Sequence, residues 1–167
     1  GLVRADHTCK PCIRPIGHDA PFQEVRPISH NPFRDGYYES EELRRFGFGA
    51  VSDNVRIARS CNIPRVDNIE IGDNVRIDAF TSIVATSGHV RLGSYIHICI
   101  GCMIGARGGV EMEDFSGLSH GGVVLSGTDD FSGAWLVNPM VPPAFTRVTA
   151  APVRFERFAI AGAHSTV

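Results

Sequence analysis

The sequence has no large excess of charge of either sign and no long apolar run. Over 167 residues the formal net charge is −2, and lysine and arginine are scattered rather than clustered. Without a basic patch, nothing in the sequence attracts nucleic acid or an anionic membrane surface. The apolar stretches are far shorter than the roughly 18 residues of a membrane span, and the N-terminus lacks the apolar core of a signal peptide. We therefore expect a cytoplasmic protein without a membrane span.

Cysteines are few and odd in number. The five are Cys9, Cys12, Cys61, Cys99 and Cys102. An odd count without a secretory signal argues against a disulfide framework. Cys9 and Cys12, with His7 and His18 nearby, could be half of a zinc site, but no second ligand pair follows at finger-like spacing. We favour free thiols on an extended or partly disordered N-terminal arm, residues 1–36, which is rich in Pro, His and Arg.

The sequence does contain a repeat of six residues. From about residue 49 an apolar residue recurs every six positions, in groups of three. These positions are Val51, Ile57 and Ile63; Ile71, Ile77 and Ile83; Leu92, Ile98 and Ile104; Met112, Leu118 and Val124; Phe155, Ala161 and Val167. A small or β-branched residue lies two positions before nearly every one. Because side chains alternate along a strand, positions i−2 and i face the same side, and we expect them to fill the inside of a coil.

The interruptions of the repeat define its three-fold grouping. Steps of six are broken only between 63 and 71, 83 and 92, 104 and 112, and 124 and 155. Each break follows a third hexad, so three hexads close one triangular coil and every insertion leaves from the same corner. Stacked coils form parallel sheets on three faces. The sequence therefore predicts an all-β domain over residues 37–167, a left-handed parallel β-helix of hexapeptide repeats.

Side chains at position i−1 point outward and form columns across the coils. On the first face they alternate in charge, as expected of a ladder of ion pairs between neighbouring coils: Glu70, Arg91, Glu111 and Arg154. On the second face the column is Arg56, Arg76, His97, Gly117 and Ile160. Cys61 and Cys102 occupy inward i−2 positions, which indicates small core residues rather than nucleophiles or ligands.

A short helix is predicted at Tyr37–Phe48, ahead of the first coil. Ser40 is suited to cap it. Acidic residues lie in its first turn and basic residues near its end, as the helix dipole favours: Glu41 and Glu42, then Arg44 and Arg45.

One long loop, residues 125–152, leaves a corner of the coil. Its Pro, Gly and Asn content argues against a regular element, and long loops inside compact repeats are usually functional. At the other end of the repeat, the last coil closes at Val167 without a distinct cap. We interpret this as a sequence from which C-terminal coils are missing.

The chain resembles the hexapeptide-repeat acyltransferases, specifically sugar O-acetyltransferases related to galactoside and maltose acetyltransferases. The resemblance covers roughly residues 37–167 and is carried by YYESEELRRFGF, IEIGDNVRIDAF, GSYIHI and EDFSGLSHGGVVLSGTDDFSGAWLVNPMVP. It implies a homotrimer that binds acetyl-CoA, or another CoA ester, between neighbouring β-helices and uses no metal. It also implies a sugar or nucleotide-sugar acceptor, whose hydroxyl attacks the thioester directly while a histidine acts as general base.

The long loop departs from the pattern of that family. Aligning on Thr128 places Asp129 or Asp130 where the family's histidine would lie. The outward-facing His97 is therefore the predicted general base, because an imidazole titrates near neutral pH; a solvated surface histidine is the alternative. His120, at a turn one coil later, is a second candidate. The two aspartates either orient a histidine of the same or a neighbouring subunit, or only form a turn.

Two further residues of the long loop, Trp135 and Asn138, are candidates to line the acceptor site. Two other functions compete with acyl transfer. A non-catalytic β-helical scaffold would need none of these side chains. A zinc-dependent carbonic anhydrase of the β-helical γ type would need three converging histidines, and His89, His97 and His120 do not have that spacing.

Overall fold

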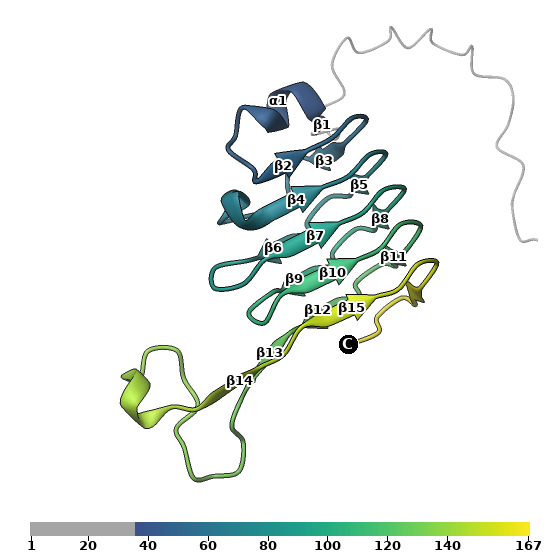
Figure 1. Cartoon of the computed structure of the whole chain (residues 1–167). Coiled ribbons are helices and arrows are strands. Elements are labelled where there is room, and N and C mark those ends of the chain that lie inside the picture. The colour runs from purple at the N-terminus through teal and green to yellow at the C-terminus, as the bar shows by residue number, and fades with distance from the viewer. Residues whose placement is uncertain (1–35) are drawn as a thin grey trace, which may run out of the picture. The chain divides into compact units, whose positions relative to one another are not determined.

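The computed structural model describes residues 36–167. In this part of the chain, short strands and turns wind into a stack of coils (Figure 1). The predicted N-terminal arm, with Cys9 and Cys12, lies outside the described residues except for Gly36.

The coils contribute strands to three sheets, and the first and last coils join the third only through isolated bridges, Asn62 with Ser82 and Thr166 with Val123. The first sheet contains β2 (Ala50–Val51), β4 (Ile69–Ile71), β7 (Val90–Leu92), β10 (Val110–Met112) and β15 (Val153–Phe155). The second contains β3 (Arg56–Ala58), β5 (Arg76–Ile77), β8 (His97–Ile98), β11 (Gly117–Leu118) and β16 (Ile160–Ala161). The third contains β6 (Ser82–Val84), β9 (Met103–Gly105) and β12 (Val123–Leu125). All these strands pair in parallel, and the predicted left-handed parallel β-helix is confirmed.

The hexad positions predicted to face inward form the core. The register stacks equivalent apolar residues directly above one another, for example Ile77, Ile98 and Leu118 in the second sheet. These three side chains are at most 1% exposed. Cys102 is buried and Cys61 half-buried, as predicted, and burial raises the pKa of both thiols.

Shortening a stacked core residue will test how much one layer of the core contributes to the free energy of unfolding. Ile98→Ala is expected to lower the free energy of unfolding by roughly 2–5 kcal/mol, because it leaves a cavity that coils on both sides cannot close. The matched control is Ile100→Ala, since Ile100 is 42% exposed and its loss should cost under about 0.5 kcal/mol. Urea unfolding followed by circular dichroism measures both, and equal losses would contradict stacking as the source of stability.

The N-terminal end of the β-helix differs from its prediction. The helix α1 is shorter (Ser40–Arg44) and follows a strand, β1 (Tyr37–Glu39), that pairs antiparallel with β3. Glu39, not Ser40, is the N-cap; it exchanges hydrogen bonds with Glu42 in a capping box. Ser40 was predicted as the cap because of its residue type, but its hydroxyl instead accepts a hydrogen bond from the Val55 amide. No helix in the described part of the chain is long and apolar enough to cross a bilayer.

This end covers the first coil. The side chain of Leu43 in α1 is 1% exposed and joins the core, with Tyr38 and Phe48 packed against it. Burying these side chains seals the first apolar layer from water, as terminal caps of repeat proteins do.

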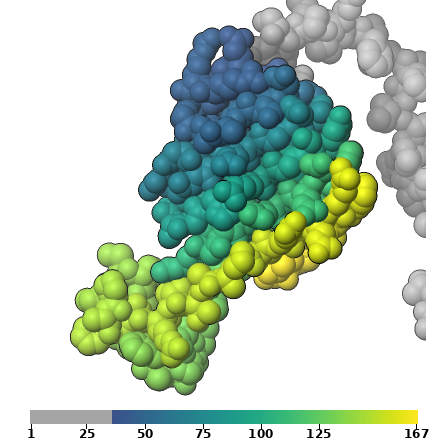
Figure 2. All heavy atoms as spheres, viewed as in Figure 1, coloured from purple at the N-terminus to yellow at the C-terminus, as the bar shows by residue number. Residues whose placement is uncertain are grey.

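The long loop contains a regular element, contrary to the prediction. Its two ends pair as antiparallel strands, β13 (Gly127–Asp129) and β14 (Val148–Ala150), and a 3₁₀ turn lies at Pro143–Phe145. We call residues 127–150 the ribbon. The two ends of the loop leave the same corner of the coil side by side. Their backbone N–H and C=O groups can therefore pair with each other. In the space-filling view the ribbon projects away from the stacked coils (Figure 2).

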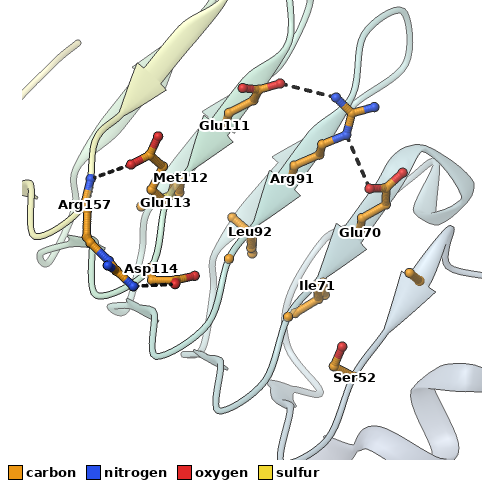
Figure 3. A pocket seen from close by; sticks show the side chains of 13 residues that line it. Ser52, Glu70, Ile71, Arg91, Leu92, Glu111, Met112, Glu113, Asp114 and Arg157 are labelled. Carbon is orange, nitrogen blue, oxygen red and sulfur yellow. Dashed lines mark hydrogen bonds and ion pairs between the residues drawn. The ribbon is translucent and has the colours of Figure 1, made fainter.

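The predicted charge ladder is confirmed over three coils and ends at the fourth. Arg91 lies 3.3 Å from both Glu70 and Glu111 (Figure 3). Arg154 lies opposite Glu111 in the register but forms its ion pair with Glu113 instead. Glu113 directly follows β10 and also accepts the backbone N–H of Arg157.

Candidate active site

His97 lies on the outer face of the second sheet, in β8, and its side chain is 43% exposed. The imidazole Nε2 lies 2.8 Å from Oδ2 of Asp78, which directly follows β5 in the coil before. Because a carboxylate only accepts hydrogen bonds, Nε2 carries the proton. Arg76 also approaches Nε2, at 2.9 Å, but it already donates to Asp78 and needs no second acceptor there. In the neutral form of the ring, this tautomer leaves the lone pair on Nδ1.

Three donors hold Asp78 as a carboxylate. Besides His97, the Tyr37 hydroxyl donates to Oδ1 at 2.8 Å, and the Arg76 Nε lies 3.0 Å from the same oxygen. Burial acts to raise the pKa of Asp78, but the hydrogen bonds from His97, Tyr37 and Arg76 outweigh it, so the pKa lies below its ordinary value. The hydrogen bond to Asp78 and burial raise the pKa of Tyr37. Asp78 is therefore ionised at neutral pH and orients the imidazole.

The ionised Asp78 should make stability depend on pH. A carboxyl whose pKa is lowered by folding stabilises the fold above its unfolded pKa of about 3.9, and this contribution is lost as the pH falls through the lowered value. Asp78→Asn should therefore be less stable than the wild type at pH 7, with a difference that shrinks below about pH 4. Asp67→Asn is the control. Asp67 pairs with Arg65 at the exposed surface, so its replacement should change the stability little at any of these pH values. Urea midpoints at several pH values measure this, and a difference independent of pH would refute the assignment.

Two hollows flank His97. The first, about 350 Å³, we call the arginine hollow; it is lined by Arg56, Asn74, Arg76, Tyr95, Ile96 and His97. The second, about 220 Å³, we call the thiol hollow; its lining includes Tyr95, His97, Cys99, Phe115, Gly117 and Ile160. Gly117 pairs with His97 in the register, so the space predicted beside the imidazole is present.

A column of aromatic rings borders both hollows. Tyr95, Phe115 and Phe158 occupy equivalent corners of three successive coils, and neighbouring rings stack at 4.9 and 5.4 Å between centroids. All three residues have positive φ angles of 61–66° and are exposed. This left-handed conformation costs a residue with a Cβ about 1–2 kcal/mol, which the stacking partly offsets.

Cys99 is the hydrogen-bond partner of the free imidazole nitrogen. Its Sγ lies 3.6 Å from Nδ1 of His97, and its side chain lines the thiol hollow. Burial and the nearby charge of Asp78 raise the pKa of the Cys99 thiol. The resting group is therefore a thiol that donates to Nδ1, and Cys99, His97 and Asp78 form one continuous line of hydrogen bonds.

The other residues predicted for the site lie elsewhere in the chain. None shares a hydrogen bond, an ion pair or a hollow with His97 in the described residues. His120 is an exposed turn residue whose carbonyl accepts the His164 amide. Asp129 pairs with Val148 in the ribbon.

The remaining ribbon candidates have local roles within their own chain. Asp130 accepts the Ser132 amide at 2.8 Å, and hydrogen bonding to the side chain and then the amide of Ser132 lowers the pKa of Asp130. Asn138 accepts the Met140 amide in the same manner. Trp135 is 39% exposed. A role for these residues in catalysis or acceptor binding stays a prediction.

The largest hollow lies on the first sheet, away from His97. It measures about 600 Å³ and is lined by the charge ladder (Figure 3). Its charged groups are four carboxylates and two guanidinium groups: Glu70, Glu111, Glu113 and Asp114, with Arg91 and Arg157. Both arginines are already paired with these carboxylates. An excess of negative charge disfavours a phosphorylated ligand, so this hollow is a poorer candidate than the two beside His97.

No cluster of three His, Cys, Asp or Glu residues suited to a metal ion occurs in residues 36–167. The three histidines that a carbonic anhydrase would require have separate partners. His89 pairs with Glu111, His97 with Asp78, and His120 bonds through its backbone.

Sequence reasoning missed Tyr37, Arg76, Asp78 and Cys99 as parts of the site. A signal for two of them was present: Arg76 and Asp78 alternate on the outward face, one coil before His97, so both lie within reach of it. Tyr37 had no such signal, because its position depends on the unpredicted strand β1.

Known proteins share this fold and much of this sequence. No family model matches the chain. The chain is 33% identical over 131 residues to dTDP-4-amino-4,6-dideoxy-D-glucose acyltransferase of Escherichia coli, covering 78% of this chain and 68% of that protein. AntD, an N-acyltransferase from Bacillus cereus, in complex with dTDP and 3-hydroxybutyryl-CoA, is 38% identical with a TM-score of 0.73, covering 79% of this chain and 69% of AntD. A serine-to-cysteine variant of AntD, bound to dTDP-4-amino-4,6-dideoxyglucose and coenzyme A, is 37% identical with a TM-score of 0.74, covering 79% and 70%.

Proposed function

Because this chain belongs to the hexapeptide-repeat, left-handed β-helix acyltransferases, we propose that it transfers an acyl group from a CoA thioester to the amino group of a nucleotide-linked sugar. The sequence predicted a hydroxyl acceptor and acetyl-CoA. Both relatives named above favour an amine, since one acts on an amino sugar and the other is an N-acyltransferase. The observation that carries the proposal is the free Nδ1 of His97, held by Asp78 between two hollows.

His97 supplies the proton acceptor that acyl transfer to an amine requires. An amine that forms an amide must lose a proton, and a neutral imidazole accepts it readily near pH 7. Asp78 fixes the tautomer in which Nδ1 is free, and it stabilises the imidazolium once the proton has moved. Tyr37 and Arg76 act on Asp78 rather than on the imidazole, because their contacts keep the carboxylate ionised and in place.

The arginine hollow suits the diphosphate of a nucleotide sugar. Two guanidinium groups, Arg56 and Arg76, face one carboxylate, Asp78, so the balance of charge is positive. Arg56 has no carboxylate partner within residues 36–167, and its guanidinium carbon lies 6.0 Å from the centroid of the Tyr37 ring. An arginine fork matches phosphate oxygens closely, and the Tyr95 ring offers a face for the base or sugar.

A homotrimer would give the ribbon a role in this site. Several of its large apolar side chains are exposed, including Phe131 at 76% and Met140 at 88%. A patch of this kind on a projecting element is typical of a protein interface. In such an assembly Asp129, Asp130 and the Trp135–Asn138 segment would reach the His97 face of a neighbouring copy and contribute to its acceptor site.

The proposal is tested by comparing matched acceptors. The purified full chain is incubated with acetyl-CoA or 3-hydroxybutyryl-CoA and with either dTDP-4-amino-4,6-dideoxyglucose or dTDP-glucose, and free CoA is measured by mass. Acceptor-dependent CoA release with the amino sugar, together with an amide product, is the expected result. Release with dTDP-glucose instead would indicate ester formation on a hydroxyl. Release with neither acceptor would favour a non-catalytic scaffold.

A further inference from the structure

The outer face of the second sheet changes character along the stack of coils, with His97 at the boundary. Its outward column, paired in register from β3 to β16, is Arg56, Arg76, His97, Gly117 and Ile160. Figure 1 shows β5, β8 and β11 in this order along the stack. The column is therefore cationic on one side of the imidazole and carries no charge on the other side.

The two hollows beside the imidazole lie on opposite sides of this boundary. They share Tyr95 and His97, and the arginine hollow adds two guanidinium groups. Among residues 36–167, none that lines the thiol hollow carries a carboxylate, ammonium or guanidinium group. Because charged groups lose free energy when they leave water without a partner, the thiol hollow suits an uncharged, apolar part of a substrate.

Gly117 lies in β11 and lines the thiol hollow, although its backbone does not require glycine. Its φ is not positive, so a residue with a Cβ could adopt the same conformation. Glycine weakens a strand, and it often marks a position that another group approaches closely. A Cβ at Gly117 would lie 3.1 Å from Cδ1 of Ile160 and 3.2 Å from the carbonyl oxygen of His97. The missing side chain therefore keeps space open beside the imidazole.

Ile160 limits the thiol hollow on the side farther from His97. It pairs with Gly117 in the register, one coil further along the stack, and its side chain lines the hollow. The residue is 64% exposed, so shortening it does not open the core. The extent of the hollow thus depends on one absent side chain and one exposed side chain.

We propose that the thiol hollow holds the acyl group of the CoA thioester, and that Gly117 and Ile160 determine which acyl groups fit. This inference rests on the proposed function for the identity of donor and acceptor. With the diphosphate in the arginine hollow and the acyl chain in the thiol hollow, the amine and the thioester carbonyl meet beside Nδ1 of His97. The amine takes the place of the Cys99 thiol as the donor to Nδ1.

The placement of the two substrates is the one that direct attack requires. The amine nitrogen bonds to the carbonyl carbon, the bond from that carbon to the CoA sulfur breaks, and the amine proton passes through His97 to the sulfur. A hollow of about 220 Å³ that ends at Ile160 favours short acyl groups over long ones.

Competition between acyl donors tests this subsite. The full chain is given equal concentrations of acetyl-CoA, butyryl-CoA and hexanoyl-CoA with dTDP-4-amino-4,6-dideoxyglucose, and the amide products are measured by mass. Ile160→Ala is expected to raise the ratio of hexanoyl to acetyl product at least about 10-fold, since one methylene in an apolar pocket changes selectivity by that much or more. Gly117→Ala should lower the ratio of butyryl to acetyl product by a similar factor. The double variant should regain butyryl transfer, because the new Cβ no longer meets Ile160.

Each substitution has a matched control on another part of the surface. Ile100→Ala removes an isoleucine that is 42% exposed and lines neither hollow beside His97. Gly105→Ala adds a Cβ in β9 of the third sheet, where it would lie 2.9 Å from Cδ2 of Leu125. Both variants should keep the wild-type product ratios. Equal changes in Ile100→Ala and Ile160→Ala would overturn the assignment.

Binding measurements separate this inference from the proposed function, because they require no turnover. Calorimetric titration should show butyryl-CoA binding at least about 5-fold more tightly than CoA, as burial of an apolar chain predicts. Gly117→Ala should lose this difference and Gly105→Ala should keep it. If this pattern appears but no amide forms, the acyl subsite is supported and the proposed acceptor is wrong. If the amide forms with the same product ratios in all variants, the proposed function stands and the subsite is overturned. Equal binding of butyryl-CoA and CoA, or binding of neither, also overturns the subsite.

Discussion

His97→Ala is expected to lower kcat for amide formation by about 10²–10⁴-fold, the range found when a positioned general base is removed. The loss should fall on kcat more than on KM, because the imidazole acts on the reacting proton rather than on the nucleotide. Acceptor-dependent release of CoA, measured by mass at saturating acyl donor, gives both constants. The folded state should be retained, since the His97 side chain lies on the surface of the second sheet.

His120→Ala is the matched control for this substitution. Both residues are histidines on the outside of successive coils, but His120 lines neither hollow beside His97. Its removal is expected to leave kcat unchanged within about two-fold. An inactive His120→Ala together with an active His97→Ala would move the general base to His120 and contradict the role of Asp78 described above.

Arg56→Ala is expected to raise KM for the nucleotide sugar by roughly 10-fold to 100-fold, with a small effect on kcat. A hydrogen bond between charged groups contributes about 1.5–3 kcal/mol, which corresponds to that change in affinity. The side chain lines the arginine hollow without a carboxylate partner in residues 36–167, so its charge is available for a ligand. Initial rates over a range of nucleotide-sugar concentrations measure the effect, which should decrease as salt is added.

Arg45→Ala provides the comparison for a general loss of positive charge. Arg45 is exposed and pairs with Glu41 at the N-terminal end of the β-helix. Its replacement should leave KM unchanged. An equal rise of KM in both variants would show that the nucleotide responds to the net charge of the protein rather than to the arginine hollow.

The fold could be predicted from the sequence because the hexad pattern recurs in every coil, so that each coil supports the same prediction. Ile77, Ile98 and Leu118 are each unremarkable, but their equal spacing predicted that they would stack, and they do. The elements that occur once lacked this support. β1 was missed because an antiparallel edge strand of three residues has no periodic signature, and its strand character depends on pairing with β3.

The site was predicted less completely than the fold. The outward position of His97 and the space beside Gly117 were predicted because the column could be read from the repeat, whereas the catalytic role of His97 stays a prediction. Its hydrogen-bond partners depend on rotamers and on residues from other coils, which spacing alone does not determine. Asp78 was overlooked because it follows an inward residue at a turn, where an aspartate is common for local reasons. The structure shows instead that its carboxylate accepts hydrogen bonds from Tyr37, Arg76 and His97.

The ribbon also bears on how such a protein can be re-engineered. The first sheet continues from β10 to β15 in unbroken register, with Val110 opposite Val153, although the whole ribbon lies between them in the chain. At the root of the ribbon, Ala151 donates to the Ser126 carbonyl at 3.0 Å, so entry and exit are already joined. A foreign hairpin of the same root spacing could therefore replace residues 127–150 without displacing any coil. Under the proposal that the ribbon lines the acceptor site of a neighbouring copy, such a replacement is expected to change acceptor preference and to leave the His97 face unchanged.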